Sequence, residues 1–372
     1  MSQREKTTLV PPSELGALQI AFVGTEAFLT YPRYTAQLAL EASWMIPLIS
    51  GMIALLVFLF INRLIESNFP GMDIVDITET TMGSFVASVV SIVLSLYFLF
   101  STAAVMRLFM EHVVATVLPD TPLLVVGLLF SVVVAYIAYL GIEAICRTAY
   151  LLLPVLFIGI VVLCLLTLNW WHPPFLLPLW GRGIPSIIRS SFLYSSIYIN
   201  VLLLLIIYPH ATDESKLGRI GVVSIVSADL LLTGFLLAYN MVFPAFEGQS
   251  ISFPLYQMAR VIYIGRFFQR MESLFIFLWV MIAVVRMSLT LWAFVHLMAR
   301  GLRWPTYKPG IAAGALLAFM LSLVPTSALQ AVTIAKTYLL EWGDVIVFGI
   351  PITVTVLASL LKTKSKRGVQ GV

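Results

Sequence analysis

The sequence predicts an all-α polytopic membrane protein with ten transmembrane helices, arranged as a 5+5 inverted repeat. Its 372 residues are 60% hydrophobic and only 11% charged, and the mean hydropathy is +1.00. Soluble globular domains carry about 25% charged residues, so this composition excludes soluble, disordered, coiled-coil and collagen-like chains. No alternation of polar and apolar residues indicates strands, and helices are the open-chain structures that satisfy backbone hydrogen bonds in lipid.

Ten apolar runs supply the predicted spans, because about 20 apolar residues cross the hydrocarbon core of a bilayer. Seven of them carry no charge: Trp44–Ile61, Met82–Met106, Thr121–Ile142, Thr148–Trp171, Ser190–Tyr208, Pro309–Ala335 and Val345–Leu361. Three contain embedded charges: Leu15–Ala39 with Glu26 and Arg33, Ile220–Phe246 with Asp229, and Ser273–Val295 with Arg286. The run Pro309–Ala335 is long enough to include a re-entrant piece, which leaves nine or eleven spans as alternatives.

The distribution of basic residues predicts that both termini are cytoplasmic. With ten spans the two ends lie on one side, and cytoplasmic loops are richer in Lys and Arg. If that side is the cytoplasm, thirteen of the 22 Lys and Arg lie in cytoplasmic segments and eight, among them Lys336, in outer segments and their flanks, while Arg286 lies within a span. No signal peptide pattern is present. We therefore expect an integral membrane protein with both termini in the cytoplasm.

The two halves of the chain share an order of features. Each has Phe-Pro, then a weakly amphipathic stretch, a glycine, an apolar run and an arginine: Phe69-Pro70, Asp73–Thr80, Gly83 and Arg107 in the first half, and Phe253-Pro254, Tyr256–Ile264, Gly265 and Arg286 in the second. Five spans per half is an odd number, so the second half must be inverted, as in many secondary transporters. We expect one membrane domain, with repeats at residues 13–171 and 186–361 and a basic tail at 362–372. Coincidence remains the alternative, since Phe-Pro is a common dipeptide.

The first span contains a candidate helix break. The segment Val23–Glu26 lies near its middle, and Tyr31-Pro32 follows about two turns later. In inverted-repeat transporters the first helix of each repeat is discontinuous, and its freed backbone groups face the ligand. Gly24 frees the backbone, Thr25 offers a hydroxyl and Glu26 places a carboxylate where charge is costly. The alternative is a packing glycine, with Glu26 turned to the outer rim.

The corresponding sixth span, Ser190–Tyr208, contains no glycine. It offers polar side chains instead, namely Tyr194, Ser195, Ser196, Tyr198 and Asn200. A break in this span is therefore less well supported than the break in the first.

Four charges lie in or beside the predicted spans. Glu26 and Asp229 are acidic, while Arg107 and Arg286 are basic. Because an unpaired charge in lipid costs several kcal/mol, we expect mutual pairing within the bundle. For Arg107 and Arg286 we favour structural ion pairs. A proton or cation relay, or a counter-charge for a zwitterionic ligand, stays open for Glu26, and Asp229 is undecided.

Two pairs of polar and aromatic residues complete the candidate site. Tyr97 and Ser101 are four residues apart, as are Ser288 and Trp292, so each pair shares one helix face. Such a face lines a cavity or joins helices through hydrogen bonds. The His and Cys residues show no metal-ligand spacing, and neither a phosphate-binding glycine loop nor a serine elbow is present. We expect no enzyme, no metal and no cofactor.

Several motifs resemble one known family. They are Gly141-x-Glu143-x-x-x-Arg147 leading to Pro154, Phe-Phe-Gln-Arg-Met-Glu at 267–272 leading through Trp279 to Arg286, and Gly24-Thr25 followed by Tyr31-Pro32. In order and spacing they are similar to the B subunits of bacterial spore germinant receptors, the spore germination permeases of the amino acid–polyamine–organocation transporter superfamily.

The resemblance implies a leucine-transporter-like fold and a permease-like subunit that binds a small nutrient, often an amino acid. It also implies that this subunit acts with receptor A and C subunits to trigger germination. The implied ligand-binding residues are Gly24, Thr25, Glu26, Tyr97, Ser101, Tyr194, Ser195, Tyr198, Ser288 and Trp292. The absence of a glycine from the sixth span departs from the pattern of two opposed helix breaks.

Two functions from different classes follow. The first is a receptor subunit in which ligand binding stabilises one conformation and signals through partner subunits. The second is a proton-coupled amino-acid permease, with Glu26 or Asp229 as the proton carrier. A purely structural membrane scaffold is a third possibility, but it leaves the mid-span Gly-Thr-Glu sequence unexplained.

Overall fold

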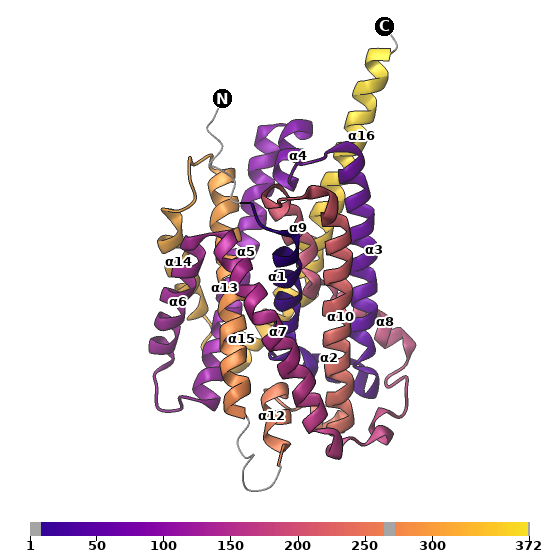
Figure 1. Cartoon of the computed structure of the whole chain (residues 1–372), viewed down its shortest axis with the longest axis vertical. Helices are drawn as coiled ribbons and strands as arrows, with labels where there is room; N and C mark the ends of the chain where they lie inside the picture. The colour runs from indigo at the N-terminus through magenta and orange to yellow at the C-terminus, as the bar shows by residue number, and fades with distance from the viewer. Residues whose placement is uncertain (1–8, 264–271, 371–372) are drawn as a thin grey trace.

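A computed structural model of the chain describes residues 9–263 and 272–370, and these form a bundle of helices (Figure 1). The α-helices are α1 (Pro12–Gly24), α2 (Tyr31–Ala39), α3 (Met45–Asn68), α4 (Ile74–Met82), α5 (Ser84–Thr116), α6 (Leu123–Leu140), α7 (Ile142–Leu166), α8 (Ile184–Leu193), α9 (Asn200–Ile207), α10 (Leu217–Val242), α11 (Ala245–Gly248), α12 (Pro254–Val261), α13 (Glu272–Gly301), α14 (Gly310–Ser322), α15 (Ala328–Ala335) and α16 (Ile350–Gln370). Gly265 and the Phe-Phe-Gln-Arg-Met part of the 267–272 motif lie outside the described residues.

Eight helical segments of the described residues are long and apolar enough to cross a membrane. They include α8 and α9 together as Ile184–His210, and α15 and α16 together as Ala328–Lys362. The broken first span, α1 and α2, and the short α14 complete the ten predicted crossings. The chain is thus an integral membrane protein with the predicted all-helical class.

The predicted break in the first span is confirmed. Helix α1 ends at Gly24, a 3₁₀ turn covers Thr25–Ala27, and α2 begins at Tyr31 with Pro32 in its first turn. The Thr25 hydroxyl donates to the carbonyl oxygen of Phe22 at 2.6 Å. Proline at a helix start has the right φ and lacks only a donor that would be unpaired there, so the sequence restarts the helix at this point.

The sixth span is also broken, although it has no glycine. Helix α8 ends at Leu193, a 3₁₀ segment covers Ser195–Tyr198, and α9 begins at Asn200. Ser195 donates its hydroxyl to the carbonyl oxygen of Phe192 at 3.0 Å. Serine side chains compete in this way with helical backbone bonds, so hydroxyl groups here accompany the break that glycine accompanies in the first span.

The ninth predicted span, Pro309–Ala335, is wrong as a single helix. Helix α14 ends at Ser322, and the last part of the run, α15, begins the tenth span. Pro325 disfavours the helical conformation of the residue before it, and the Ser327 side chain caps α15 by accepting from the backbone N–H of Gln330 at 3.2 Å. The apolar run hides this boundary because both sides of it are uncharged.

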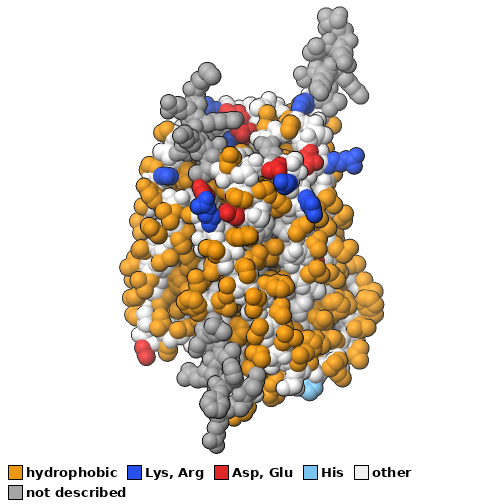
Figure 2. All heavy atoms as spheres, viewed as in Figure 1, with side chains coloured by type: hydrophobic (Ala, Val, Ile, Leu, Met, Phe, Trp, Pro, Cys, Tyr) orange, Lys and Arg blue, Asp and Glu red, His pale blue; other side chains and the backbone are white. Residues whose placement is uncertain are grey.

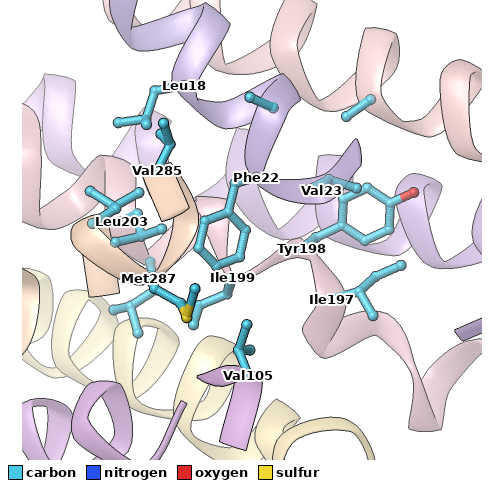
Figure 3. Close-up of a cluster of buried hydrophobic side chains, with 14 of the residues drawn as sticks. Leu18, Phe22, Val23, Val105, Ile197, Tyr198, Ile199, Leu203, Val285 and Met287 are labelled. Atoms are coloured by element: carbon cyan, nitrogen blue, oxygen red, sulfur yellow. The ribbon is translucent and has the colours of Figure 1, made fainter. Parts of the chain in front are cut away.

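The third and eighth spans, α5 and α13, form an antiparallel pair through the centre of the bundle. Ser91 and Ser95 donate to the carbonyl oxygens of Leu297 and Phe294 at 2.7 and 2.9 Å. Small hydroxyl side chains allow close helix approach in membranes and join the helices by hydrogen bonds. Around this pair the core is apolar, with Phe22 at the centre of a cluster from α1, α5, α13 and the sixth span (Figure 3).

The two connector helices lie at opposite ends of the molecule, as an inverted repeat requires. Helix α4 follows the second span and α12 follows the seventh, and Figure 1 shows α4 at the end where α16 finishes and α12 at the other. On the face drawn in Figure 2, basic and acidic side chains gather towards the α4 end, above a largely hydrophobic surface. This distribution supports the expectation that the α4 end is cytoplasmic.

Helix α4 is tied to the end of the eighth span by ion pairs. Asp73 caps α4 by accepting from the backbone N–H of Asp76 at 2.7 Å, and Arg300 pairs with both carboxylates. The Arg300 Nη2 to Asp76 Oδ1 distance is 2.7 Å. These contacts join the connector helix α4 to α13.

We expect Asp73→Asn to change the pH dependence of thermal stability. Burial raises the pKa of Asp73 from 3.8 to about 6, assisted by the nearby charge of Asp76 and opposed by Arg300. A carboxyl with a raised folded-state pKa contributes stability at low pH that is lost as the pH rises through that pKa. The unfolding midpoint of the wild type should therefore fall relative to the variant between about pH 4 and pH 7. The exposed Asp120→Asn is the control, and a constant difference from wild type across this range for Asp73→Asn contradicts the prediction.

Candidate functional site

A small cavity lies beside the break in the first span. Its volume is about 40 Å³, which is room for only a few water molecules. Its walls come from the first-span break, α5, the sixth-span break, α13 and the tenth span. The polar lining residues are Glu26, Thr30, Tyr31, Tyr34, Tyr97, Ser101, Ser196, Arg286 and Lys336, and the apolar ones include Leu29, Val105, Leu108, Ile197, Ile199, Leu339 and Leu340.

A buried ion pair lies in the cavity wall. Arg286 Nη1 is 2.6 Å from Glu26 Oε1, and both side chains are 7% exposed. The same nitrogen donates to the Thr25 hydroxyl oxygen at 2.5 Å, while the guanidinium lies 4.4 Å from the centre of the Phe22 ring. The predicted pairing of embedded charges is thus found here, between the first-span break and the eighth span.

Arg286 keeps one donor unused. Its Nε is buried and has no hydrogen-bond partner among the described residues. A buried unpaired donor is costly, so this N–H is an uncompensated polar group beside the ion pair.

The tenth span widens where it meets the cavity. Residues Lys336–Glu341 form a π-helical segment, and Ser196 of the sixth-span break is within 2.9 and 2.8 Å of the carbonyl oxygens of Leu339 and Leu340. Lys336 Nζ is 3.6 Å from Glu341 and 5.5 Å from the centre of the Tyr34 ring. Single π-helical turns are frequent at functional sites. The assignment of Lys336 to an outer segment is wrong, because the ninth span ends early and this lysine lies within the tenth.

The tenth span also approaches the sixth-span break through Gly343 and Asp344. The Ser195 hydroxyl oxygen also lies 3.0 Å from Asp344 Oδ1. A Cβ atom on Gly343 would lie 2.9 Å from the Cβ of Ser196 and 3.2 Å from the Tyr97 hydroxyl. Glycine is therefore needed at 343 for this close approach.

Three of the predicted ligand-binding residues line the cavity directly, namely Glu26, Tyr97 and Ser101. Thr25 contacts Arg286, and Ser195 lies next to the lining residue Ser196. These five predictions are thus brought together around one space.

The other predicted residues lie outside the cavity wall. A Cβ atom on Gly24 would face Leu156 and Leu231 at 3.1 and 3.4 Å, away from the cavity. The Tyr194 ring packs edge-on against Tyr31, with ring centres 6.2 Å apart. The Tyr198 hydroxyl oxygen lies 2.7 Å from Asp229 Oδ1, within hydrogen-bond distance.

Ser288 and Trp292 lie on the side of α13 away from the cavity. The Ser288 hydroxyl donates to the carbonyl oxygen of Val284 in its own helix at 2.7 Å, and Trp292 stacks on His296 with ring centres 4.8 Å apart. Side chains two positions apart in a helix, such as those of Arg286 and Ser288, point in directions that differ by about 200° around the helix axis. Because Arg286 points into the cavity, Ser288 must point away from it, and Trp292 shares the face of Ser288.

Arg107 has a structural role, as the sequence favoured. It pairs with Glu111 at 2.8 Å and donates to the carbonyl oxygen of Ser322 at 3.2 Å. Among the residues that the structure describes, Asp229 has no such partner of opposite charge. Sequence reasoning did not place Lys336 and Tyr34 at the site. The available signals for Lys336 were Pro325 and Ser327, which set the start of the tenth span.

Comparison with known families supports the resemblance seen in the motifs. The model of a family described as spore germination protein matches residues 11–331. Spore germination protein XB of Bacillus anthracis is 25% identical over 177 residues, which are 47% of this chain and 49% of that protein. Spore germination protein KB of Bacillus subtilis (strain 168) is 24% identical over 258 residues, 68% of this chain and 69% of the relative. The match thus spans about half the length of the first relative and about two thirds of the second.

Solved structures with a similar fold are transporters. A nucleobase-cation-symport-1 family transporter, in a closed conformation with bromovinylhydantoin bound, matches with a TM-score of 0.63 at 14% identity, over 93% of this chain and 79% of the other. A Na⁺-coupled sialic acid symporter in an outward-open state matches with a TM-score of 0.59 at 13% identity, over 96% and 82% of the two chains. At these identities the likeness shows the fold alone.

Proposed function

The chain belongs to the spore germination protein family, and from this premise we propose that it is the membrane subunit of a nutrient germinant receptor. In this proposal a small ligand, an amino acid, binds in the cavity between the first-span and sixth-span breaks. The bound state is passed to receptor A and C subunits, which trigger germination. The chain lies in the cell membrane or spore inner membrane with both termini in the cytoplasm.

The observation that carries the proposal is the charge arrangement around the cavity. One carboxylate, Glu26, and two cations, Arg286 and Lys336, border a space whose other walls are formed by uncharged hydroxyl-bearing and apolar side chains. A zwitterionic amino acid has groups complementary to both signs, and charge-assisted hydrogen bonds are roughly twice as strong as neutral ones. The unpaired Nε of Arg286 adds a donor for a carboxylate oxygen.

The size of the cavity supports a sensing mechanism that includes movement. A space of about 40 Å³ is too small for an amino acid, so binding requires the walls to separate. A ligand that binds only the wider conformation shifts the population towards it by its difference in affinity. The first-span and sixth-span breaks and the tenth span meet at the cavity, so their arrangement must change on binding.

Ligand binding by the purified full chain in lipid nanodiscs tests the proposal. We expect at least one L-amino acid of the twenty to raise the thermal unfolding midpoint. Filling the cavity with Ser101→Leu should weaken that binding by about tenfold or more, equivalent to ~1.4 kcal/mol. Ser84→Leu, an exposed serine at the start of the same helix, is the control. Unchanged affinity in Ser101→Leu would place the ligand elsewhere.

The second candidate function is a proton-coupled amino-acid permease. It is favoured by one observation: the carboxyl of Asp229 is buried in mid-membrane and has no cation partner within residues 9–263 and 272–370. Uptake into proteoliposomes driven by a pH gradient supports the permease. Binding without uptake, together with genes for A-like and C-like subunits beside this one, supports the receptor.

A further inference from the structure

A carboxyl group lies buried midway along the seventh span. Asp229 is 7% exposed and is the thirteenth residue of the 26-residue helix α10. Its carboxyl sits over Gly51 of α3, where a Cβ atom would lie 2.4 Å from the carboxyl carbon. The site is separate from the cavity, because Asp229 is not among the lining residues.

No cation neutralises this carboxyl within the described residues. No Lys, Arg or His nitrogen lies within 4.0 Å of it, and the titratable groups facing it are the hydroxyls of Tyr198 and Tyr31. Glu26, on the first-span break that packs against α10, is paired with Arg286. The remaining charged side chains that the structure describes on α10 and on the elements packed on it lie near helix ends: Glu14 of α1, Arg63 and Glu66 of α3, Glu143 and Arg147 of α7, Lys216 of the 3₁₀ segment before α10, Arg219 of α10, Glu247 of α11 and Arg260 of α12.

The Tyr198 hydroxyl has two close acceptors but only one hydrogen. Both contacts can be hydrogen bonds only if Asp229 carries a proton of its own. The Tyr198 hydroxyl oxygen is 2.7 Å from Asp229 Oδ1 and 3.2 Å from the carbonyl oxygen of Pro47. A phenol has a single hydrogen to donate, so with an ionised carboxylate one of the two contacts has no hydrogen. If Asp229 is a carboxylic acid, it donates to Tyr198, and Tyr198 donates to Pro47.

The membrane favours the same protonation state. A charged Asp at the centre of a spanning helix costs about 2.5–3.5 kcal/mol on insertion scales. Among the described residues no cation is paired with Asp229, and the donors beside it are the hydroxyls of Tyr198 and Thr233, which are too few to compensate that cost. Both the hydrogen count and the solvation cost therefore indicate a neutral acid.

We propose that Asp229 is a proton-binding site that holds the sixth-span break against α3. In the protonated state the acid O–H donates to Tyr198 Oη, and the Tyr198 O–H donates to the Pro47 carbonyl oxygen. When the proton leaves to water, the Tyr198 hydrogen turns to the carboxylate and the bond to Pro47 is lost. Because Tyr198 is the last residue of the 3₁₀ segment Ser195–Tyr198, proton release loosens the break on the side opposite the tenth span.

Infrared spectroscopy of the full chain in nanodiscs tests the protonation state directly. At neutral pH, the carbonyl stretching band of a protonated carboxylic acid should be present in the wild type and reduced in Asp229→Asn. The exposed Asp120→Asn should leave the band unchanged. An identical acid band in wild type and Asp229→Asn would overturn the proposal.

Thermal unfolding against pH tests the link to structure. Asparagine matches a protonated aspartic acid in shape and can donate to Tyr198, so Asp229→Asn should have the wild-type midpoint at about pH 4, where the unfolded carboxyl is also protonated. As the pH rises from about 4 towards neutrality, the wild-type midpoint should fall relative to that of the variant, because unfolding then releases the proton that the folded wild type holds. Parallel curves would overturn the proposal.

A second variant keeps the test available if Asp229→Asn does not fold. Tyr198→Phe removes the acceptor of the acid O–H and should shift the acid band without removing it. An unshifted band would contradict the assigned hydrogen bond. Neither measurement uses a ligand, so failure here and failure of the proposed ligand site are distinguishable.

Discussion

Replacing Arg286 with methionine is expected to lower the free energy of unfolding by about 3–5 kcal/mol, because it leaves Glu26 as a buried charge without its partner. Both side chains are 7% exposed and their atoms are 2.6 Å apart. The loss of the Thr25 contact and of the contact with the Phe22 ring adds to the effect. Unfolding of the purified chain by denaturant or heat measures it.

Two comparisons identify the cause of this loss. The double variant Glu26→Gln, Arg286→Met should recover much of the stability, since removing both charges leaves no uncompensated carboxylate. Arg107→Met is the matched control, because its partner Glu111 is 25% exposed and can be hydrated. An Arg286→Met loss no larger than that of Arg107→Met would show that the Glu26 pair is not the source.

Replacing Lys336 with methionine is expected to weaken amino-acid binding by about 10- to 100-fold, or about 1.4–2.7 kcal/mol. The lysine is a cavity cation whose own partner, Glu341, is 3.6 Å away and partly exposed. Exposed and half-exposed pairs of this kind contribute little to stability. The protein should therefore fold normally and lose affinity for the ligand carboxylate.

Binding of L-amino acids and of the corresponding amino-acid amides to the nanodisc protein measures this effect. The wild type should prefer the acids, and Lys336→Met should bind acid and amide alike. Lys308→Met is the matched control, because Lys308 lies 5.7 Å from a tyrosine ring, nearly as Lys336 does at 5.5 Å, but on the surface. A preserved preference for the acid in Lys336→Met would assign the carboxylate to Arg286 alone.

The parts of the candidate site that could be predicted are those with strong local signals. Glu26 is conspicuous because a charge in an apolar run is rare, and the Gly24-Thr25 break is followed by a proline that restarts the helix. Tyr97 and Ser101 share a helix face, which local spacing determines. The direction in which that face points depends on how the helix packs against its neighbours. For this reason Ser288 and Trp292, which have the same spacing, lie on the side of their helix away from the cavity.

The boundary between the ninth and tenth spans is another feature that local sequence signals did not predict correctly. Hydropathy averages over a window and treats Pro309–Ala335 as one uncharged run, whereas the chain turns at Pro325 and begins a new helix at Ala328. Because the tenth span begins at Ala328, Lys336 lies in the cavity wall and not in an outer segment. The same early start places Gly343 and Asp344 against the sixth span. Proline and capping-serine signals were present in the sequence, but only packing showed what they position.

The sequence by itself determined the membrane environment, the helical class, the approximate number of spans and the short list of embedded charges. These properties follow from composition and local spacing, because lipid penalises every unpaired polar group wherever it lies. The tertiary structure decided which charges meet: Arg286 with Glu26, Arg107 with Glu111, and Asp229 with a tyrosine instead of a cation. Such pairings depend on the rotation and depth of helices distant in the chain, and these are set by the packing of the whole bundle.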